Sequence, residues 1–273
     1  MIPAPFDYVR ADDAAAALAA LGEHGDEAKL LAGGQSLLPL MKLRLAMPSV
    51  VVDVSHATDL RYVRTDGDAL AIGALTRHCD VAADKTVRQE LPMLAHVAEL
   101  VGDPQVRHRG TIGGSVAHSD PSADLPTALV ALGASYVVQG PSGERVVPAD
   151  EFATGFLETV LEPDELLTEV RVPLGVAGWG YEKFTRRAID WATVAVAAVR
   201  RDGETRIALA NMGPTVLRAA AAERALATGA GTADAAGSAD EETEPGNDVT
   251  ASSDYRRHLA RVLTGRALAA ASA

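Results

Sequence analysis

The chain has 273 residues, with 25 Lys and Arg against 37 Asp and Glu, and a formal net charge of −12 at pH 7. This length allows one large domain or two smaller ones, with a hydrophobic core that needs no disulfide or metal. The acidic balance argues against a nucleic-acid-binding protein, which needs a basic face. The single cysteine, Cys79, excludes an intrachain disulfide, an iron–sulfur cluster and a thiolate zinc site built from this chain alone.

The composition predicts a soluble, cytoplasmic protein. A single cysteine fits a reducing compartment. Residues 1–3 do not begin a basic segment followed by an apolar core, so we expect no signal peptide. The longest apolar runs, such as residues 192–199, fall short of the roughly 20 residues that a spanning helix needs. We therefore expect no membrane span.

The chain begins with a β-α-β-α-β pattern. Strands are expected at residues 6–10, 29–32 and 50–54, with helices between them, the second over residues 37–45. Asp12 or Asp13 can cap the first helix, and Gly25 can end it. Strands that alternate with short helices indicate a small parallel sheet.

The middle of the chain changes character. Strands are expected at residues 70–74, 135–139, 144–147 and 166–172, and helices at residues 76–83, 91–101 and 127–132. The run Gly-Pro-Ser-Gly at residues 140–143 separates two of these strands and predicts a hairpin. This sheet is therefore expected to be mixed or antiparallel.

The last part of the chain is expected to hold strands at residues 181–185, 192–200 and 207–210, and helices at residues 216–227 and 254–270. Between the two helices, residues 229–254 carry seven carboxylates, no Lys or Arg and one large apolar residue, Val249. Such a composition cannot offset the entropy cost of ordering the chain. We expect a mobile surface loop that can be shortened with little loss of stability.

Together these patterns predict an α+β fold in three parts. The first is a small parallel βαβαβ unit, the second a mixed or antiparallel sheet with helices, and the third an α/β domain with a three-stranded sheet and helices. The expected bounds of these parts are residues 1–56, 57–176 and 177–273.

Two glycine-rich segments carry the chemical signal. The first is LLAGGQSL at residues 30–37, where a strand ends in two glycines and a helix begins at once. Free backbone N–H groups at a helix start attract phosphate, and glycine allows a close approach. The segment is not a Walker A loop, because no Gly-Lys-Ser/Thr follows, and it is not a GxGxxG motif.

The second segment is RHRGTIGGSVAHSDPSADLP at residues 107–126. Its glycines and hydroxyl residues also suit phosphate, and Asp120 and Asp124 can accept hydrogen bonds from ribose hydroxyls. Two such segments predict a ligand with a diphosphate and sugars, bound between two subdomains. The residues alone therefore predict a protein that binds a dinucleotide or a nucleotide sugar.

The chain resembles the FAD-binding medium subunits of molybdenum hydroxylases in the two segments AGGQSLLPLMKLRLA and GTIGGSVAHSDPSADLP. This family includes the flavoprotein subunit of aerobic carbon monoxide dehydrogenase and the FAD domain of xanthine dehydrogenase. The resemblance also covers MIPAPFDYVR, ELLTEVRVP, GYEKFTRR and DYRRHLARVLTGRAL, and it is weakest over residues 229–254. It implies an FAD-binding domain at residues 1–176 and a C-terminal flavoprotein domain at residues 177–273 that contains the acidic loop 229–254.

The resemblance implies that FAD lies extended between the two N-terminal subdomains, without a covalent bond. The residues assigned to the first pyrophosphate loop and its flanks are Lys29, Ala32, Gly33, Gly34, Gln35, Ser36 and Leu37. Those assigned to the second loop are Thr111, Ile112, Gly113, Gly114 and Ser115, with Ser115 where many relatives carry Asn. Asp124 and, as a second candidate, Asp120 match a contact to the adenosine or ribitol part. The residues that match regions near the flavin are Val101, Leu167 and Lys183.

The resemblance also implies partners. A large subunit would hold the molybdenum cofactor, a small subunit would hold two [2Fe–2S] clusters, and the complex would be a dimer of heterotrimers. Electrons would reach FAD through the clusters and leave to an external acceptor, either a quinone or NAD. The substrate of the complex stays open among carbon monoxide, an aldehyde, a purine and another N-heterocycle.

Two alternative functions are kept. One is a stand-alone flavin oxidase of the vanillyl-alcohol oxidase type, although Gln35 stands where many of those enzymes carry a histidine that binds FAD covalently. The other is a non-redox nucleotide-binding protein.

Other reactive side chains have plainer interpretations. The histidines His78, His108 and His118 show no metal-ligand spacing and are expected to be solvated or hydrogen bonded. Cys79 is expected to be buried and structural. Arg107 and Arg109 can pair either with phosphate or with carboxylates. The aromatic residues expected to pack in the core, with a place near the flavin as the alternative, are Trp179, Tyr181 and Trp191.

Overall fold

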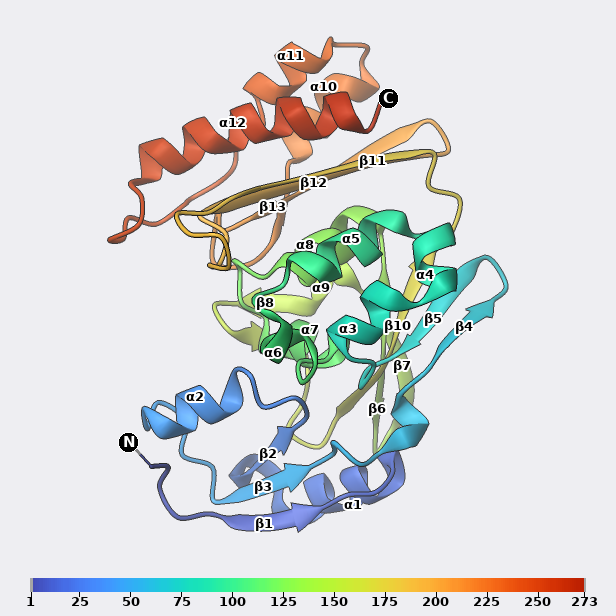
Figure 1. Ribbon diagram of the computed structural model, residues 1–273, viewed down its shortest axis with the longest axis vertical. Helices are drawn as coiled ribbons and strands as arrows, with labels where there is room; N and C mark the ends of the chain where they lie inside the picture. Colours follow the sequence, from blue (N-terminus) through green and yellow to red (C-terminus); the bar gives the residue numbers. More distant parts are fainter. Residues whose placement is uncertain (1, 273) are drawn as a thin grey trace.

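Three units are stacked along the long axis of the molecule, each built around its own β-sheet (Figure 1). The computed structural model describes residues 2–272. One sheet is parallel and the others are antiparallel, and helices cover them, which confirms the predicted α+β fold. Among the described residues, no helix is both long and apolar enough to cross a membrane.

The N-terminal unit is the predicted β-α-β-α-β arrangement. Its parallel strands are β1 (Asp7–Arg10), β2 (Ala28–Leu31) and β3 (Val50–Asp53), in the order β1-β3-β2. Asp13 caps α1 (Ala14–His24), because its carboxylate accepts a hydrogen bond from the Ala16 N–H at 2.7 Å, and a 3₁₀ turn (Gly25–Glu27) follows. α2 (Leu37–Lys42) ends earlier than expected, since Arg44 takes a left-handed φ of 57°.

The middle unit is an antiparallel sheet, as expected. Across the sheet its strands are β4 (Val63–Asp66), β5 (Ala69–Gly73), β10 (Leu166–Pro173), β6 (Ser135–Gly140) and β7 (Gly143–Pro148). The predicted hairpin is β6–β7, whereas β4, which follows a 3₁₀ turn (Thr58–Leu60), was not predicted. After β7 come α9 (Ala149–Phe152) and a small second hairpin, β8 (Ala153–Gly155) with β9 (Glu158–Thr159).

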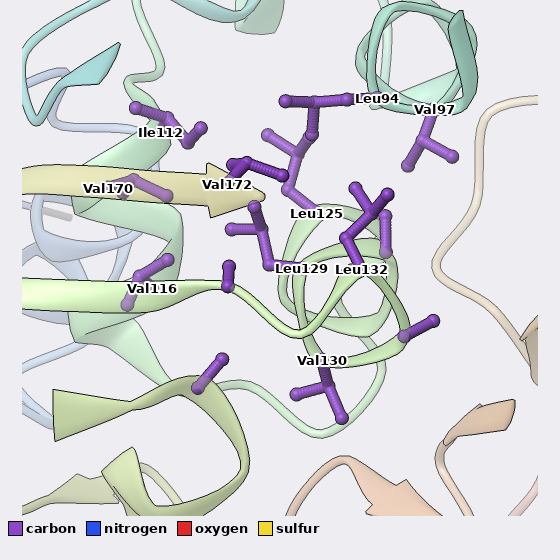
Figure 2. Close-up of a cluster of buried hydrophobic side chains, with 14 of the residues drawn as sticks. Leu94, Val97, Ile112, Val116, Leu125, Leu129, Val130, Leu132, Val170 and Val172 are labelled. Atoms are coloured by element: carbon purple, nitrogen blue, oxygen red, sulfur yellow. The ribbon is translucent and has the colours of Figure 1, made fainter. Parts of the chain in front are cut away.

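Helices between β5 and β6 build the largest hydrophobic core. They are α3 (His78–Ala83), α4 (Lys85–Glu90), α5 (Pro92–Leu100), α6 (Pro104–Arg107), α7 (Ile112–His118) and α8 (Asp124–Leu132). Figure 2 shows Leu125 and Leu129 of α8 gathered with Leu94 of α5 and Val172 of β10. Because α8 also contacts β12 and β13, every residue of this helix is buried. The core thus fixes Asp124, at the start of α8, between two sheets.

The C-terminal unit is an antiparallel sheet with helices on its outer face (Figure 1). Its strands are β11 (Gly178–Phe184), β12 (Val194–Arg201), β13 (Glu204–Ala210) and β14 (Leu217–Arg218), and its helices are α10 (Ala220–Ala227), α11 (Thr232–Gly237) and α12 (Ser253–Ala270). The three predicted strands are present, and β14 extends the sheet. The helix expected from residue 216 therefore begins only at Ala220.

The prediction of a mobile loop at residues 229–254 is wrong. This segment contains α11, and Ala235, Ala236 and Ala239 are buried. Asp240 is also buried, and its carboxylate accepts a hydrogen bond from the Arg261 guanidinium of α12 at 2.6 Å. Small alanine side chains and ion pairs to α12 therefore order a segment that has only one large apolar residue, Val249.

A buried arginine ties the end of this segment to the sheet. Arg256 of α12 is 2% exposed, and its guanidinium donates to the Asp248 carboxylate at 2.6 Å and to the Thr193 carbonyl. Asp248 also accepts hydrogen bonds from the Thr250 hydroxyl and backbone N–H. These hydrogen bonds, together with the charge of Arg256, lower the pKa of Asp248 to about 2.

Asp248→Asn should lower the free energy of unfolding at pH 7 by about 1 kcal/mol, because the buried Arg256 would lose its charged partner, while solvent already screens the half-exposed Asp248 carboxylate. The pKa of Asp248 is depressed in the folded state, so its stabilisation is present above the ordinary carboxyl pKa of about 4 and is lost as the pH falls toward 2. The difference between variant and wild type should shrink between about pH 5 and pH 2, as measured by urea unfolding. Glu241→Gln, an exposed carboxylate of the same segment, is the control. A difference in unfolding free energy between variant and wild type that does not change with pH would contradict this role of Asp248.

Candidate functional site

A cleft of about 910 Å³ opens where the N-terminal unit, the middle unit and the chain after β11 meet. Both glycine segments line it. The sequence-predicted site residues in its wall are Lys29, Ala32, Gly33, Gly34, Gln35, Ser36, Leu37, Val101, Thr111, Gly113, Gly114, Ser115, Asp124, Leu167 and Lys183. Residues that lie more than 150 positions apart in the sequence, such as Lys29 and Lys183, thus face one cavity.

Two predicted site residues do not line the cleft. Ile112 is fully buried, and its side chain belongs to the main core, where Figure 2 shows it near Val170 of β10. Asp120 closes a local turn instead, where its carboxylate accepts hydrogen bonds from the Ser122 N–H at 2.8 Å and the Ser122 hydroxyl at 2.6 Å.

The two glycine segments touch through their backbones at Gly33. A Cβ atom placed on Gly33 would lie 2.3 Å from the Arg109 carbonyl oxygen and 2.7 Å from the Gly110 Cα. Neither neighbour is a flexible side chain, so no other residue fits without moving the backbone. Next in the chain, Gly34 has a φ of +75°, a conformation that glycine adopts readily.

The first glycine segment leaves a row of backbone donors available. The N–H groups of residues 33–37 donate no hydrogen bond to any residue between 2 and 272, and these residues line the cleft. Consecutive free N–H groups around a left-handed glycine form a concave site that suits an anion. This part of the expectation from the sequence is present in the structure.

The second glycine segment is built differently from the expected loop. Thr111 caps α7, and Gly113 and Gly114 lie in its first turn. The Ile112 N–H donates to the Thr76 carbonyl at 3.0 Å, and the Gly113 N–H donates to the Ala74 carbonyl at 2.8 Å. These two N–H groups are therefore not available to a phosphate, because carbonyls of the turn after β5 already accept their hydrogen bonds.

Glycine at position 113 has a packing role instead. A Cβ on Gly113 would lie 2.5 Å from the Ala74 Cβ and 2.7 Å from the Ala74 carbonyl oxygen. The absence of a side chain lets α7 lie directly against the end of β5. Ser115 of α7 and the neighbouring backbone surface therefore line the cleft, whereas the first N–H groups of the helix do not face it as free donors.

Asp124 and Lys183 form a pair inside the cleft wall. The Lys183 ammonium donates to one oxygen of the Asp124 carboxylate at 2.8 Å, and the Tyr181 hydroxyl donates to the other at 2.6 Å. Asp124 is only 6% exposed, and burial raises its pKa, although Lys183 and Tyr181 oppose that rise. The pair joins α8 of the middle unit to β11 of the C-terminal unit.

Sequence reasoning placed Asp124 and Lys183 separately and expected core packing for Tyr181, with a place near the flavin as the alternative. The signal that could have found the triad is the spacing of Tyr181 and Lys183, because residues two apart on a strand face the same side. Burial of Tyr181 itself is confirmed, and Trp179 packs beside the main core at 5.6 Å from the His96 ring.

The segment after β11 completes the cleft. Trp191 is 59% exposed and lines the cavity, so the expectation of core packing is wrong for this residue. Two side chains of the C-terminal unit hold the segment after β11 in place. The Asn211 side chain donates to the Ala192 carbonyl at 2.9 Å, and the Arg256 guanidinium donates to the Thr193 carbonyl. Trp191 is thereby presented to the cleft by the C-terminal unit.

Two side chains near the second segment have local roles. The Arg107 guanidinium donates to the Val101 and Gly102 carbonyls, each at 3.1 Å, and so pairs with backbone rather than with a carboxylate. Cys79 is partly exposed, not buried as expected. Sequence reasoning also missed the wall formed by the β8–β9 region, including Thr154, Leu157 and Leu161, for which no motif gives a signal.

Known protein families and individual relatives match this chain over nearly its whole length. The FAD binding domain in molybdopterin dehydrogenase matches residues 4–175, and the CO dehydrogenase flavoprotein C-terminal domain matches residues 179–271. The carbon monoxide dehydrogenase medium chain of Hydrogenophaga pseudoflava is 43% identical over 99% of this chain and 98% of that protein.

Other relatives act on different compounds. The caffeine dehydrogenase subunit beta of a Pseudomonas strain is 36% identical over 100% of this chain and 96% of its own length. Among solved structures, quinoline 2-oxidoreductase from Pseudomonas putida 86 superposes with a TM-score of 0.92 at 34% identity, over 100% of this chain and 99% of that one.

Lys183→Met should lower the free energy of unfolding at pH 7 by roughly 3 kcal/mol or more, because Asp124 would be left as a buried charge without a cation. Without Lys183 the already raised pKa of Asp124 should rise further, so the loss should be smaller at pH 5, where the carboxyl can bind a proton. Denaturant unfolding at both pH values measures the two losses.

The double variant Asp124→Asn/Lys183→Met removes both charges and should recover much of the loss. An equal loss at pH 5 and pH 7, or no recovery in the double variant, would show that the charge pair does not control stability here.

Proposed function

Because the chain belongs to the family of FAD-binding medium subunits of molybdenum hydroxylases, we propose that its cleft binds FAD non-covalently and that the bound flavin carries electrons for a multi-subunit dehydrogenase. Carbon monoxide dehydrogenase and xanthine dehydrogenase subunits stand among its relatives. The observation that carries the proposal is the row of free N–H groups at residues 33–37, which faces the cleft where the two glycine segments meet.

The residues of the cleft fit this cofactor. The free N–H groups at residues 33–37 would take the diphosphate, and Gly33 and Gly34 leave the space for it. Lys29, Leu37, Val101, Thr111, Ser115, Leu167 and the Asp124–Lys183 pair would form the walls that orient the rest of the molecule. Gln35 provides no imidazole for a covalent flavin bond, so the cofactor would be held by contacts alone.

The chain's own contribution is binding, orientation and exclusion of water. FAD supplies the chemistry of accepting electrons one or two at a time and releasing them to an acceptor. The cleft wall is largely apolar, with Leu161, Ile189 and Trp191 among its residues. Such walls keep solvent from the ring and limit side reactions.

The proposal includes partner subunits. Relatives are named as subunits of dehydrogenase complexes, such as the 6-hydroxypseudooxynicotine dehydrogenase complex. A single cysteine places any [2Fe–2S] cluster on another chain, and we propose a small iron–sulfur subunit and a large molybdenum subunit, arranged as a dimer of heterotrimers in the cytoplasm. The acceptor is proposed to be a quinone or NAD.

The alternatives are not favoured. A stand-alone flavin oxidase is not supported by relatives that are named as a dehydrogenase medium chain or as a subunit of a dehydrogenase complex. A non-redox nucleotide-binding protein is likewise not supported by relatives that are dehydrogenase subunits.

Gly33→Ala should weaken FAD binding by roughly a hundredfold or more, because its Cβ would displace the Arg109 carbonyl and separate the two glycine segments. Binding is measured by the change in flavin fluorescence on adding the apoprotein. The wild-type protein should release all of its flavin when denatured with guanidinium. Gly22→Ala, in α1 where a Cβ meets no atom within 4 Å, is the control. Flavin that stays with the denatured chain would disprove non-covalent binding, and full affinity in Gly33→Ala would disprove the site.

Substrate should bleach the flavin band only when the partner subunits are present. Residues 2–272 contain no group of His, Cys, Asp or Glu side chains that could hold a metal ion. Carbon monoxide, an aldehyde or a purine added anaerobically should therefore leave the spectrum of the isolated chain unchanged. The purified complex should bleach with one of these substrates. Bleaching of the isolated chain would instead support the stand-alone oxidase.

A further inference from the structure

One titratable side chain in the cleft wall has no partner in the fold. His78, the first residue of α3, is 4% exposed and lines the cleft. Its Nδ1 atom is buried without a hydrogen bond. Its Nε2 atom also has no partner among residues 2–272, but it is not fully buried. Buried polar atoms are nearly always paired, so this one calls for an explanation.

His78 lies at the junction of the two glycine segments. A Cβ on Gly110 would be 2.7 Å from both the Nε2 and Cδ2 atoms of the ring, so this edge packs on the Gly110 backbone. Gly110 in turn packs on Gly33, whose Cβ would be 2.7 Å from the Gly110 Cα. The backbone of His78 is fixed to the same point, since its N–H donates to the Gly110 carbonyl at 3.0 Å. Gly110 therefore lies between the imidazole edge of His78 and Gly33.

The surroundings keep this imidazole neutral. Burial and the charge of Arg107 lower the pKa of His78 to about 4, so it carries one ring proton at pH 7. That proton belongs on Nε2, because an Nδ1–H would be a buried donor with no acceptor, whereas Nε2 is not fully buried and His78 lines the cleft. His78 thus presents a single uncharged donor to whatever occupies the junction.

Stability alone does not explain a histidine here. An apolar side chain of similar size would avoid the cost of burying Nδ1 without a partner. The free N–H groups of residues 33–37 lie beside the same junction and attract an anion. A phosphate oxygen held there would accept the hydrogen bond that Nε2 lacks.

We propose that His78 is a cofactor-binding residue that donates a hydrogen bond from Nε2 to a phosphate oxygen of the bound dinucleotide. The inference rests on the proposed function, because it assumes that the cleft takes FAD. It assigns to α3 a contact that neither glycine segment provides, and it explains why a buried imidazole is retained without a partner.

Three substitutions of His78 separate this role from packing. The amide nitrogen of Gln reaches the position of Nε2, whereas that of Asn reaches only Nδ1, and Phe keeps a ring without a donor. His78→Asn and His78→Phe should raise the dissociation constant for FAD about tenfold or more, as expected for loss of a hydrogen bond to a charged group. His78→Gln should stay within about threefold of wild type. The apoprotein of His78→Phe should melt at or above the wild-type temperature.

Competition with ADP tests the acceptor. The same substitutions should weaken ADP binding by a similar factor, because ADP carries the diphosphate without the flavin. Unchanged ADP affinity alongside weakened FAD affinity would overturn the phosphate assignment.

Nitrogen-15 NMR of the wild-type protein reports which ring nitrogen of His78 carries the proton, and it does not require that any variant folds. Between about pH 6 and pH 8, His78 should be neutral with its proton on Nε2, and addition of FAD should shift the Nε2 resonance. A proton on Nδ1, or no shift of the Nε2 resonance with FAD, would overturn the proposal.

The binding measurements can also overturn it. One such result is equal FAD affinity in all three variants. The other is a loss of FAD affinity in His78→Gln as large as that in His78→Asn. If wild type itself fails to bind FAD, the proposed function fails, and that outcome is distinct from these.

Discussion

The contact between the Gly33 backbone and the Arg109–Gly110 backbone is the constraint on which the cleft depends. It sets the distance between the parallel N-terminal sheet and α7 to a value that admits no side chain at position 33. A second close contact, between Gly113 and Ala74, presses α7 onto the end of β5. Glycines at these two points therefore act first as spacers between elements. Because of that spacing, residues 33–37, whose N–H groups are free, line the same cleft as residues of α7.

Much of this architecture could be predicted from local sequence patterns. The alternation of strands and helices before residue 56 and the hairpin around residues 140–143 follow from residue types that act over a few positions, and both are present. The second glycine segment was predicted as a phosphate-binding loop from its glycines and hydroxyl residues, and glycine is a poor helix former. The structure overrides that preference, since Thr111 caps the helix and the carbonyls of Ala74 and Thr76 bind its first N–H groups. Such long-range partners leave no trace in the local pattern.

Ion pairs between residues far apart in the sequence could not be predicted from local patterns either. Residues 229–254 contain too little apolar surface to fold alone, and the sequence predicted mobility on that ground. Order comes from arginines of α12, a helix that begins only at Ser253. Arg256 and Arg261 pair with Asp248 and Asp240 of the segment. In the cleft, Asp124 and Lys183 are 59 positions apart, so their pairing depends on how α8 and β11 pack and not on any motif.

These long-range contacts make the C-terminal unit part of the cleft. Lys183 and Tyr181 reach from β11 to the Asp124 carboxylate, and Arg256 reaches from α12 to the Thr193 carbonyl, close in the chain to Trp191. The acidic segment holds Arg256 in place through Asp248. One wall of the cavity is therefore positioned by helices that lie on the far face of the C-terminal sheet (Figure 1). It follows that the glycine segments alone do not make the cleft, and that the two matched domains act as one binding unit.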